Sequence, residues 1–207
     1  MHASTVESPG LALRLKTETA ALHERMHDLM AQAQPFASRE RYARFVAVQY
    51  LFQRDVEHLF DDAWVRELLP DLDTRGRQAA ALADLRDLGV EAPAAGLPAS
   101  AEVDMPAALG WLYVSEGSTL GAAFLLKEVK ERLGLSEDFG ARNLAAYPEG
   151  RAASWRRFVA ALDGDGLDTE AHDAVIEGAQ AAFDRYGRLL MRCFGLELPP
   201  AALSEAV

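Results

Sequence analysis

Residues 105–134 read MPAALGWLYVSEGSTLGAAFLLKEVKERLG, and they predict one long helix because apolar residues recur every three or four positions. Three glycines, Gly110, Gly117 and Gly121, interrupt this helix, and each costs about 1 kcal/mol relative to alanine. Spacings of seven and four place all three on one face. That face is a strip of bare backbone. It predicts either close packing against another helix or a flat ligand lying directly on the strip.

The same periodicity runs through the rest of the chain, with no sustained alternation typical of a strand. We therefore expect an all-α fold, and 207 residues suit a single-domain helical bundle. The expected domain covers residues 11–196, between a flexible N-terminal tail (1–10) and a C-terminal tail (197–207). The other expected helices cover residues 11–33, 39–64 (with Ser38 as N-cap), 73–88, 150–162 and 168–194, with a short element near 136–144.

Composition excludes several classes of protein. A net charge of −11 and a pI near 4.9 argue against nucleic-acid binding, because there is no basic excess to release counterions. Neither a secretory signal nor a run of about 18 apolar residues is present, so we expect a soluble, cytoplasmic protein without membrane contact. The single cysteine, Cys193, excludes an internal disulfide and is expected in the core.

The first predicted helix contains a histidine that needs an explanation. His23 lies at the edge of an apolar stripe, where a histidine is either a hydrogen-bonded core residue or a ligand. Lys16 precedes it by seven residues, on the same face and about 10 Å away along the axis. A neutral imidazole in that position could ligate the metal of a flat cofactor while the ammonium group meets a carboxylate at its rim.

Four segments together resemble the heme oxygenases, most closely the bacterial branch. LKTETAALHE (15–24) is similar to the family's first helix, and GWLYVSEGSTLGAAFLLKEV (110–129) to its glycine-rich distal helix. YPEGRAASWRRFVAAL (147–162) and VIEGAQAAFDRYGRLL (175–190) are looser matches. The resemblance spans residues 11 to about 194 and implies the heme oxygenase fold.

The resemblance also implies roles for individual residues. His23 becomes the iron ligand, and Lys16 and Arg156 become contacts of the heme propionates. The expected distal face contains Gly117, Ser118 and Gly121, and the expected pocket contacts are Tyr113 and Phe183. Animal members have an aspartate at the place of Ser118 and a basic residue at that of Ala160, so this chain departs from their pattern at both positions.

The activity that the resemblance implies is oxidative cleavage of heme by O2, with heme as both substrate and cofactor. Electrons come from an external donor such as a ferredoxin or a flavoprotein reductase, and the products are biliverdin, CO and Fe2+. The alternative is a non-catalytic helical protein of the same fold that binds heme or another small molecule. The glycine strip favours turnover, because storage of heme does not need an oxygen-binding face.

Other motifs suggest other chemistry. HERMH (23–27) matches the H-E-x-x-H pattern of zinc proteases, but Met30 and Ala33 stand where the extended motif needs glycine and histidine. The sequence leaves open whether a remote residue such as Glu57 supplies a third zinc ligand. Asp163 and Asp165 begin a loop that resembles a calcium site only in part, and a turn with Asp168 as N-cap is the simpler interpretation.

The start of the second predicted helix is basic. Its arginines are expected to form a solvated face, and the hypothesis that they dock an acidic electron donor is left open. These arginines are Arg39, Arg41 and Arg44.

Overall fold

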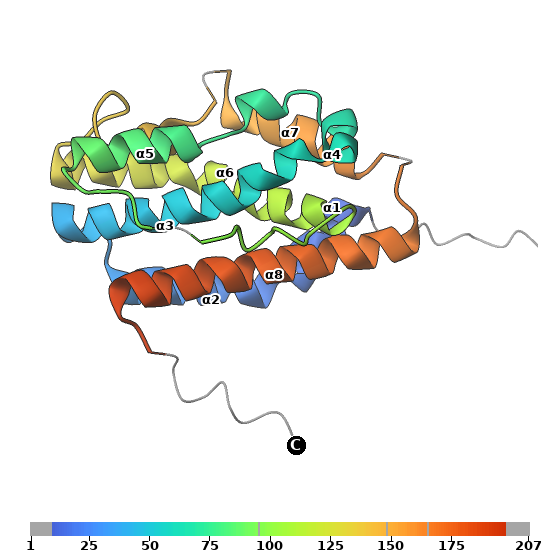
Figure 1. The fold of residues 1–207 in the computed structure, drawn as a ribbon, viewed down its shortest axis with the longest axis horizontal. Coiled ribbons are helices and arrows are strands. Elements are labelled where there is room, and N and C mark those ends of the chain that lie inside the picture. Colours follow the sequence, from blue (N-terminus) through green and yellow to red (C-terminus); the bar gives the residue numbers. More distant parts are fainter. Residues whose placement is uncertain (1–9, 95, 148, 165, 198–207) are drawn as a thin grey trace, which may run out of the picture.

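The computed structural model describes residues 10–94, 96–147, 149–164 and 166–197, and these residues form helices and no strand (Figure 1). The expectation of an all-α fold is confirmed. The predicted tails lie outside the described residues at 1–9 and 198–207. The α-helices are α1 (Leu11–Glu18), α2 (Ala20–Ala33), α3 (Arg39–His58), α4 (Ala63–Leu68), α5 (Gln78–Asp87), α6 (Ala107–Leu133), α7 (Arg151–Leu162) and α8 (Thr169–Phe194). Short 3-10 helices are η1 (Leu59–Asp61), η2 (Leu72–Thr74) and η3 (Arg142–Ala145).

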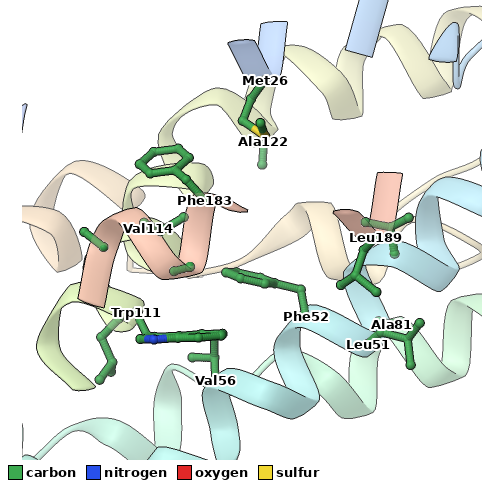
Figure 2. Packing of buried hydrophobic residues seen from close by; sticks show 14 of the residues in the cluster. Met26, Leu51, Phe52, Val56, Ala81, Trp111, Val114, Ala122, Phe183 and Leu189 are labelled. Carbon is green, nitrogen blue, oxygen red and sulfur yellow. The ribbon is translucent and has the colours of Figure 1, made fainter. Parts of the chain in front are cut away.

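Helix α8 organises the bundle, because it packs against α1, α2, α3 and α6 (Figure 1). Helix α3 also packs against α5, and α7 lies against α6. The core contains aromatic side chains from three helices. Phe52 of α3 stacks on Trp111 of α6 at a centroid distance of 6.2 Å and meets Tyr186 of α8 edge-to-face at 5.2 Å. Figure 2 shows Phe52 and Trp111 among the buried residues.

The first predicted helix is divided in two at Thr19, which corrects the expectation of one helix over residues 11–33. Thr19 has φ −106° and ψ 4°, and its hydroxyl is buried. The hydroxyl donates a hydrogen bond to the carbonyl oxygen of Leu15 at 2.7 Å. A side chain bonded four residues back in this way bends a helix. Lys16 and His23 therefore lie on consecutive helices and not on one straight helix.

The glycines of α6 do not share one environment, which divides the predicted strip. A Cβ on Gly110 would overlap the carbonyl oxygen of Val175 in α8, whereas a Cβ on Gly117 would make ordinary contact with the Trp155 ring, at 3.8 Å. A Cβ on Gly121 would meet no atom of the described residues within 4 Å. Close packing between helices thus explains Gly110, and only the C-terminal part of the strip is open to a ligand.

The helix predicted from residue 73 begins later, at Gln78, after η2. The carboxylate of Glu57 in α3 accepts hydrogen bonds from the backbone N–H groups of Arg77, at 2.6 Å, and of Gln78. A carboxylate at this position satisfies free N–H groups at the start of a helix and fixes where α5 begins. Burial of Glu57 raises the pKa of its carboxyl, against the lowering by these hydrogen bonds.

The aspartates near the start of α8 have structural partners. Asp168 accepts from the backbone N–H of Ala171 at 2.9 Å, which confirms it as N-cap. Asp163 accepts from the backbone N–H of Ala12 at 2.9 Å and so joins the end of α7 to α1. Asp165, the other residue of the calcium interpretation, lies outside the described residues.

Three further expectations concern membrane crossing, the N-cap of α3 and the environment of Cys193. No helix in the described ranges has both the length and the apolar character needed to cross a membrane. Ser38 caps α3 as predicted, because its hydroxyl accepts from the backbone N–H of Arg41 at 3.2 Å. Cys193 packs against the core, as expected, and is half-buried.

Candidate functional site

His23 lies in the first turns of α2 with its imidazole exposed to solvent. Its ring meets Phe183 of α8 edge-to-face at a centroid distance of 6.4 Å. It also meets His27, one turn later, edge-to-face at 4.7 Å. The fold therefore brings the predicted ligand and the predicted pocket wall together, although 160 residues separate them along the chain. An exposed imidazole with an aromatic wall beside it can accept a metal-centred ligand.

The open part of the glycine strip is bordered by exposed apolar side chains. Leu120 is 39% exposed and Phe124 is 78% exposed, and both lie on α6 beside Gly121. Large apolar side chains that gather on an exposed face mark a binding surface. The space in front of Gly117 and Gly121, which a Cβ would enter freely, gives a flat ligand access to the helix backbone.

The core connects these two parts of the site. Met26 of α2, Ala122 of α6 and Phe183 of α8 belong to one buried cluster, and Figure 2 shows them in the same region. Two open surface hollows, beside Arg86 and beside Tyr147, include none of the predicted site residues. The candidate site is therefore an open face bordered by α2, α6 and α8.

Tyr113 is half-buried on α6, one turn before Gly117. Its ring lies 5.5 Å from Trp155 of α7, and burial raises the pKa of its phenol. The ring of Trp155 also lies 3.8 Å from a Cβ placed on Gly117. Trp155 thus forms a wall of the strip that sequence reasoning missed, even though it stands next to Arg156.

Two exposed cations lie on the helices that adjoin the site. Lys16 of α1 and Arg156 of α7 make no hydrogen bond or ion pair with any other described residue. Arg157, by contrast, pairs with Glu149 at 3.3 Å and with Asp71 at 3.5 Å. The two predicted propionate contacts are therefore available for ligand carboxylates, whereas their basic neighbour is used within the fold.

Ser118 belongs to a polar cluster behind the strip. Its hydroxyl donates to the carbonyl oxygen of Ser115 at 2.6 Å and accepts from Arg77 at 3.3 Å. Arg77 also donates to the carbonyl and hydroxyl oxygens of Ser115, and Gln53 of α3 donates to the same hydroxyl at 3.3 Å. Arg77 is 5% exposed, makes no salt bridge within the described ranges, and its Nε has no partner there. A buried guanidinium whose Nε–H has no partner among the described residues can donate to a ligand or to ordered water.

A second buried polar contact lies one turn away on α3. Gln49 donates from Nε2 to the phenol oxygen of Tyr186 at 2.5 Å, and it precedes Gln53 by four residues. Burial raises the pKa of Tyr186 well above its ordinary value, so this phenol stays protonated at neutral pH. Neither the side-chain contacts of Arg77 in α6 nor this pair was predicted, because the residues that they join are more than 30 positions apart in the sequence.

The zinc interpretation of HERMH lacks a third ligand. Glu57, the remote candidate, is hydrogen-bonded to the start of α5. Among the described residues, no group of three His, Cys, Asp or Glu side chains is arranged to hold a metal ion. A catalytic zinc site uses three protein ligands, so the pair His23 and His27 does not complete one.

Two of the three basic residues at the start of α3 have structural roles. Arg39 donates to the carbonyl oxygen of Leu133 at 2.8 Å, at the end of α6. Arg41 donates to Ala33 and Gln34 at the end of α2 and lies over the ring of Phe194. Cations at helix C-termini satisfy free carbonyl groups. Arg44 is exposed and makes no hydrogen bond or ion pair with another described residue, so of the three it is the candidate for docking.

Fold and site together define an all-α protein that presents an imidazole on α2, free cations on α1 and α7, and an open backbone strip on α6. Comparison with known proteins identifies the family. The heme oxygenase family model matches residues 9–192. Heme oxygenase PigA of Pseudomonas aeruginosa is 48% identical over 182 residues, which cover 87% of this chain and 91% of that protein.

Solved structures agree. The NO- and CO-bound heme oxygenase of Neisseria meningitidis has a TM-score of 0.85 at 38% identity, over 96% of both chains. Heme oxygenase-1 of the cyanobacterium Synechocystis, solved in complex with heme, has a TM-score of 0.75 at 15% identity, over 90% of this chain and 93% of that one. The second similarity concerns the fold alone. The chain belongs to the heme oxygenase family, whose members are heme-degrading oxidoreductases.

Proposed function

We propose that this protein cleaves heme with O2 and external electrons, giving biliverdin, CO and Fe2+. The observation that carries the proposal is the combination of an exposed histidine against Phe183 with a glycine strip that is open at Gly117 and Gly121. Side chains at those two positions would keep a flat macrocycle away from the helix. Heme is the substrate, and its iron supplies the site at which O2 binds.

His23 is the proposed iron ligand. An imidazole binds iron in its neutral form and donates less electron density to the metal than a cysteine thiolate does. Phe183 limits the positions open to this ring, because it stands edge-on to it at 6.4 Å. His23 then fixes the depth at which the macrocycle lies between α2 and α6.

Lys16 and Arg156 are the proposed partners of the heme propionates. Both are exposed, and neither has a partner among the described residues. Each ion pair at the surface contributes at most about 1 kcal/mol. Their main effect is to set the rotation of the macrocycle in its plane, to which Tyr113 also contributes as a neighbouring contact.

On the distal side, Gly117 and Gly121 admit the ligand, and the polar cluster of Ser118, Ser115 and Arg77 lies behind them. We infer that this cluster holds ordered water that delivers protons during the reaction. The guanidinium of Arg77 has an unused N–H group at Nε, and a water molecule can accept from it. No strong general acid is needed in this arrangement.

The electron donor is proposed to be a ferredoxin or a flavoprotein reductase that docks near Arg44. Charge reversal in Arg44→Glu should slow turnover with the protein donor at low salt and leave turnover with ascorbate unchanged. Arg41 is unsuitable for this test because its substitution would also remove a helix cap. Equal rates for Arg44→Glu and the native protein with the protein donor at low salt would exclude Arg44 from docking.

The cytoplasmic location of the protein stays a prediction.

The activity is tested by mixing the purified protein with one equivalent of hemin and adding ascorbate in air with catalase present. We expect the Soret band to decay while a biliverdin band grows at longer wavelength. A stable reduced or oxygenated heme spectrum would contradict the proposal and favour the heme-carrying alternative.

A further inference from the structure

His27 has no role in the site described above, yet it lies directly beside His23. The two histidines occupy positions i and i+4 of α2, and both are exposed. Their ring centroids are 4.7 Å apart, with an angle of 74° between the ring planes. Neither imidazole makes a hydrogen bond with another described residue, so their ring nitrogens are available to a ligand.

The spacing of the rings fits two ligands of one metal ion. A Zn–N bond of about 2.0–2.1 Å places the ion roughly 3.2 Å from the centroid of each imidazole ring. Two centroids 4.7 Å apart then subtend an angle of about 95° at the ion. This angle lies between those of octahedral and tetrahedral coordination, so the separation of the rings is compatible with both imidazoles binding one ion.

We propose that the heme-free protein binds one divalent first-row transition-metal ion through His23 and His27. Imidazole suits Zn2+, Ni2+ and Cu2+, and water completes the coordination. The neighbourhood favours a cation, since Glu24 and Asp28 lie on the same helix and Arg25 is directed to Asp184 at 3.6 Å.

Ion and heme compete for the protein, because both use the imidazole of His23; this step rests on the proposed function. An ion bound to His23 and His27 blocks the binding of heme. Bound heme in turn occupies His23 and leaves the ion with only one of its two protein ligands. Ferrous iron, a product of the proposed reaction, stands low in the order of metal affinities. The pair therefore binds Fe2+ more weakly than Zn2+ and does not retain the product.

The test is calorimetric titration of the heme-free full chain with ZnCl2. His2 is replaced by alanine in all variants, so that it does not contribute to the signal. We expect one Zn2+ per chain, and affinity lower by at least about tenfold in both His23→Ala and His27→Ala, because each loses the second arm of the chelate. His172→Ala is the matched control and should bind as the parent does. Unchanged affinity in His27→Ala would overturn the proposal.

Measurements with hemin distinguish a failure of the metal-site proposal from a failure of the proposed function. Hemin-loaded protein should take up no Zn2+ at this site, and His27→Ala should bind hemin as the parent does, as followed by the Soret band. Equal Zn2+ uptake with and without hemin would contradict competition. If His23→Ala lost Zn2+ binding but kept native hemin binding, the zinc site would stand and the assignment of the heme ligand would fail.

Discussion

Gly110 of α6 lies against Gly178 of α8, so closely that a Cβ on Gly110 would come within 2.7 Å of the carbonyl carbon of Gly178. A Cβ on Gly178 would in turn overlap the carbonyl oxygen of Ala107. The backbones of the two helices are therefore in direct contact. This contact holds the N-terminal half of α6 against α8, while the C-terminal half carries the open strip.

Gly110→Ala should destabilise the protein. The added methyl group meets backbone atoms that cannot rotate away, and overpacking of this kind costs about 1–3 kcal/mol. Urea denaturation measures the free energy of unfolding. The control is Gly121→Ala, where the methyl group meets no atom of the described part of the chain and the same change should stabilise an exposed helix by up to about 1 kcal/mol. Equal effects at the two positions would contradict the division of the strip.

Gly121→Leu should leave the fold intact and impair the reaction. The side chain has space on the surface of α6, but it fills the volume that the proposed ligand needs. We expect an unfolding midpoint no lower than that of the native protein, and oxidation of bound hemin slower by at least about tenfold, which is roughly 1.4 kcal/mol in the barrier. The decay of the Soret band with ascorbate measures the rate. Native oxidation in this variant would remove Gly121 from the distal face.

Arg77→Met should slow oxidation without abolishing hemin binding. Methionine fills part of the same volume but cannot donate to Ser115, Ser118 or water. Loss of a positioned proton-delivery group typically costs about 100-fold or more, and we expect at least tenfold. Arg151→Met is the matched control, because Arg151 also donates to a backbone carbonyl and also has an unpartnered Nε. If both variants oxidised hemin equally fast, the role of Arg77 would be only structural.

Asp71 should make stability depend on pH. Burial raises the pKa of its carboxyl, but hydrogen bonds and charge from Arg75, with a smaller contribution from Arg157, outweigh this and lower it overall. A carboxyl whose pKa is lower in the folded state contributes stability above its unfolded pKa, about 3.9, and loses it as the pH falls through the folded value. The stability difference between the native protein and Asp71→Asn should therefore be present at neutral pH and close at acid pH. A constant difference, measured by urea denaturation, would contradict this.

The fold was predictable because the helical period runs through nearly the whole chain and no competing pattern exists. The kink at Thr19 was not, since a threonine in a helix bends it only when its hydroxyl bonds back to the carbonyl, here that of Leu15. The late start of α5 depends on Glu57, which lies 20 residues before Arg77. Local sequence carries no sign of either contact.

Short spacings in the sequence carried the predictions for the site, and the roles of these residues stay predictions. His23 and Lys16 are seven residues apart, and the resemblance named their roles. Arg77 was not predictable, because TRGRQ lies at the start of the helix predicted over residues 73–88 and the burial of Arg77 depends on partners about 40 residues away in α6. Gly110 and Gly121 look alike in sequence, and only the position of α8 separates a packing glycine from an open one.

The most direct test of the central claim is resonance Raman spectroscopy of the ferrous heme complex, which detects the iron–imidazole stretching band. The band should appear in the native protein and in His27→Ala and disappear in His23→Ala, with loss of biliverdin formation in that variant alone. A band that persisted in His23→Ala, together with undiminished oxidation, would contradict His23 as the iron ligand.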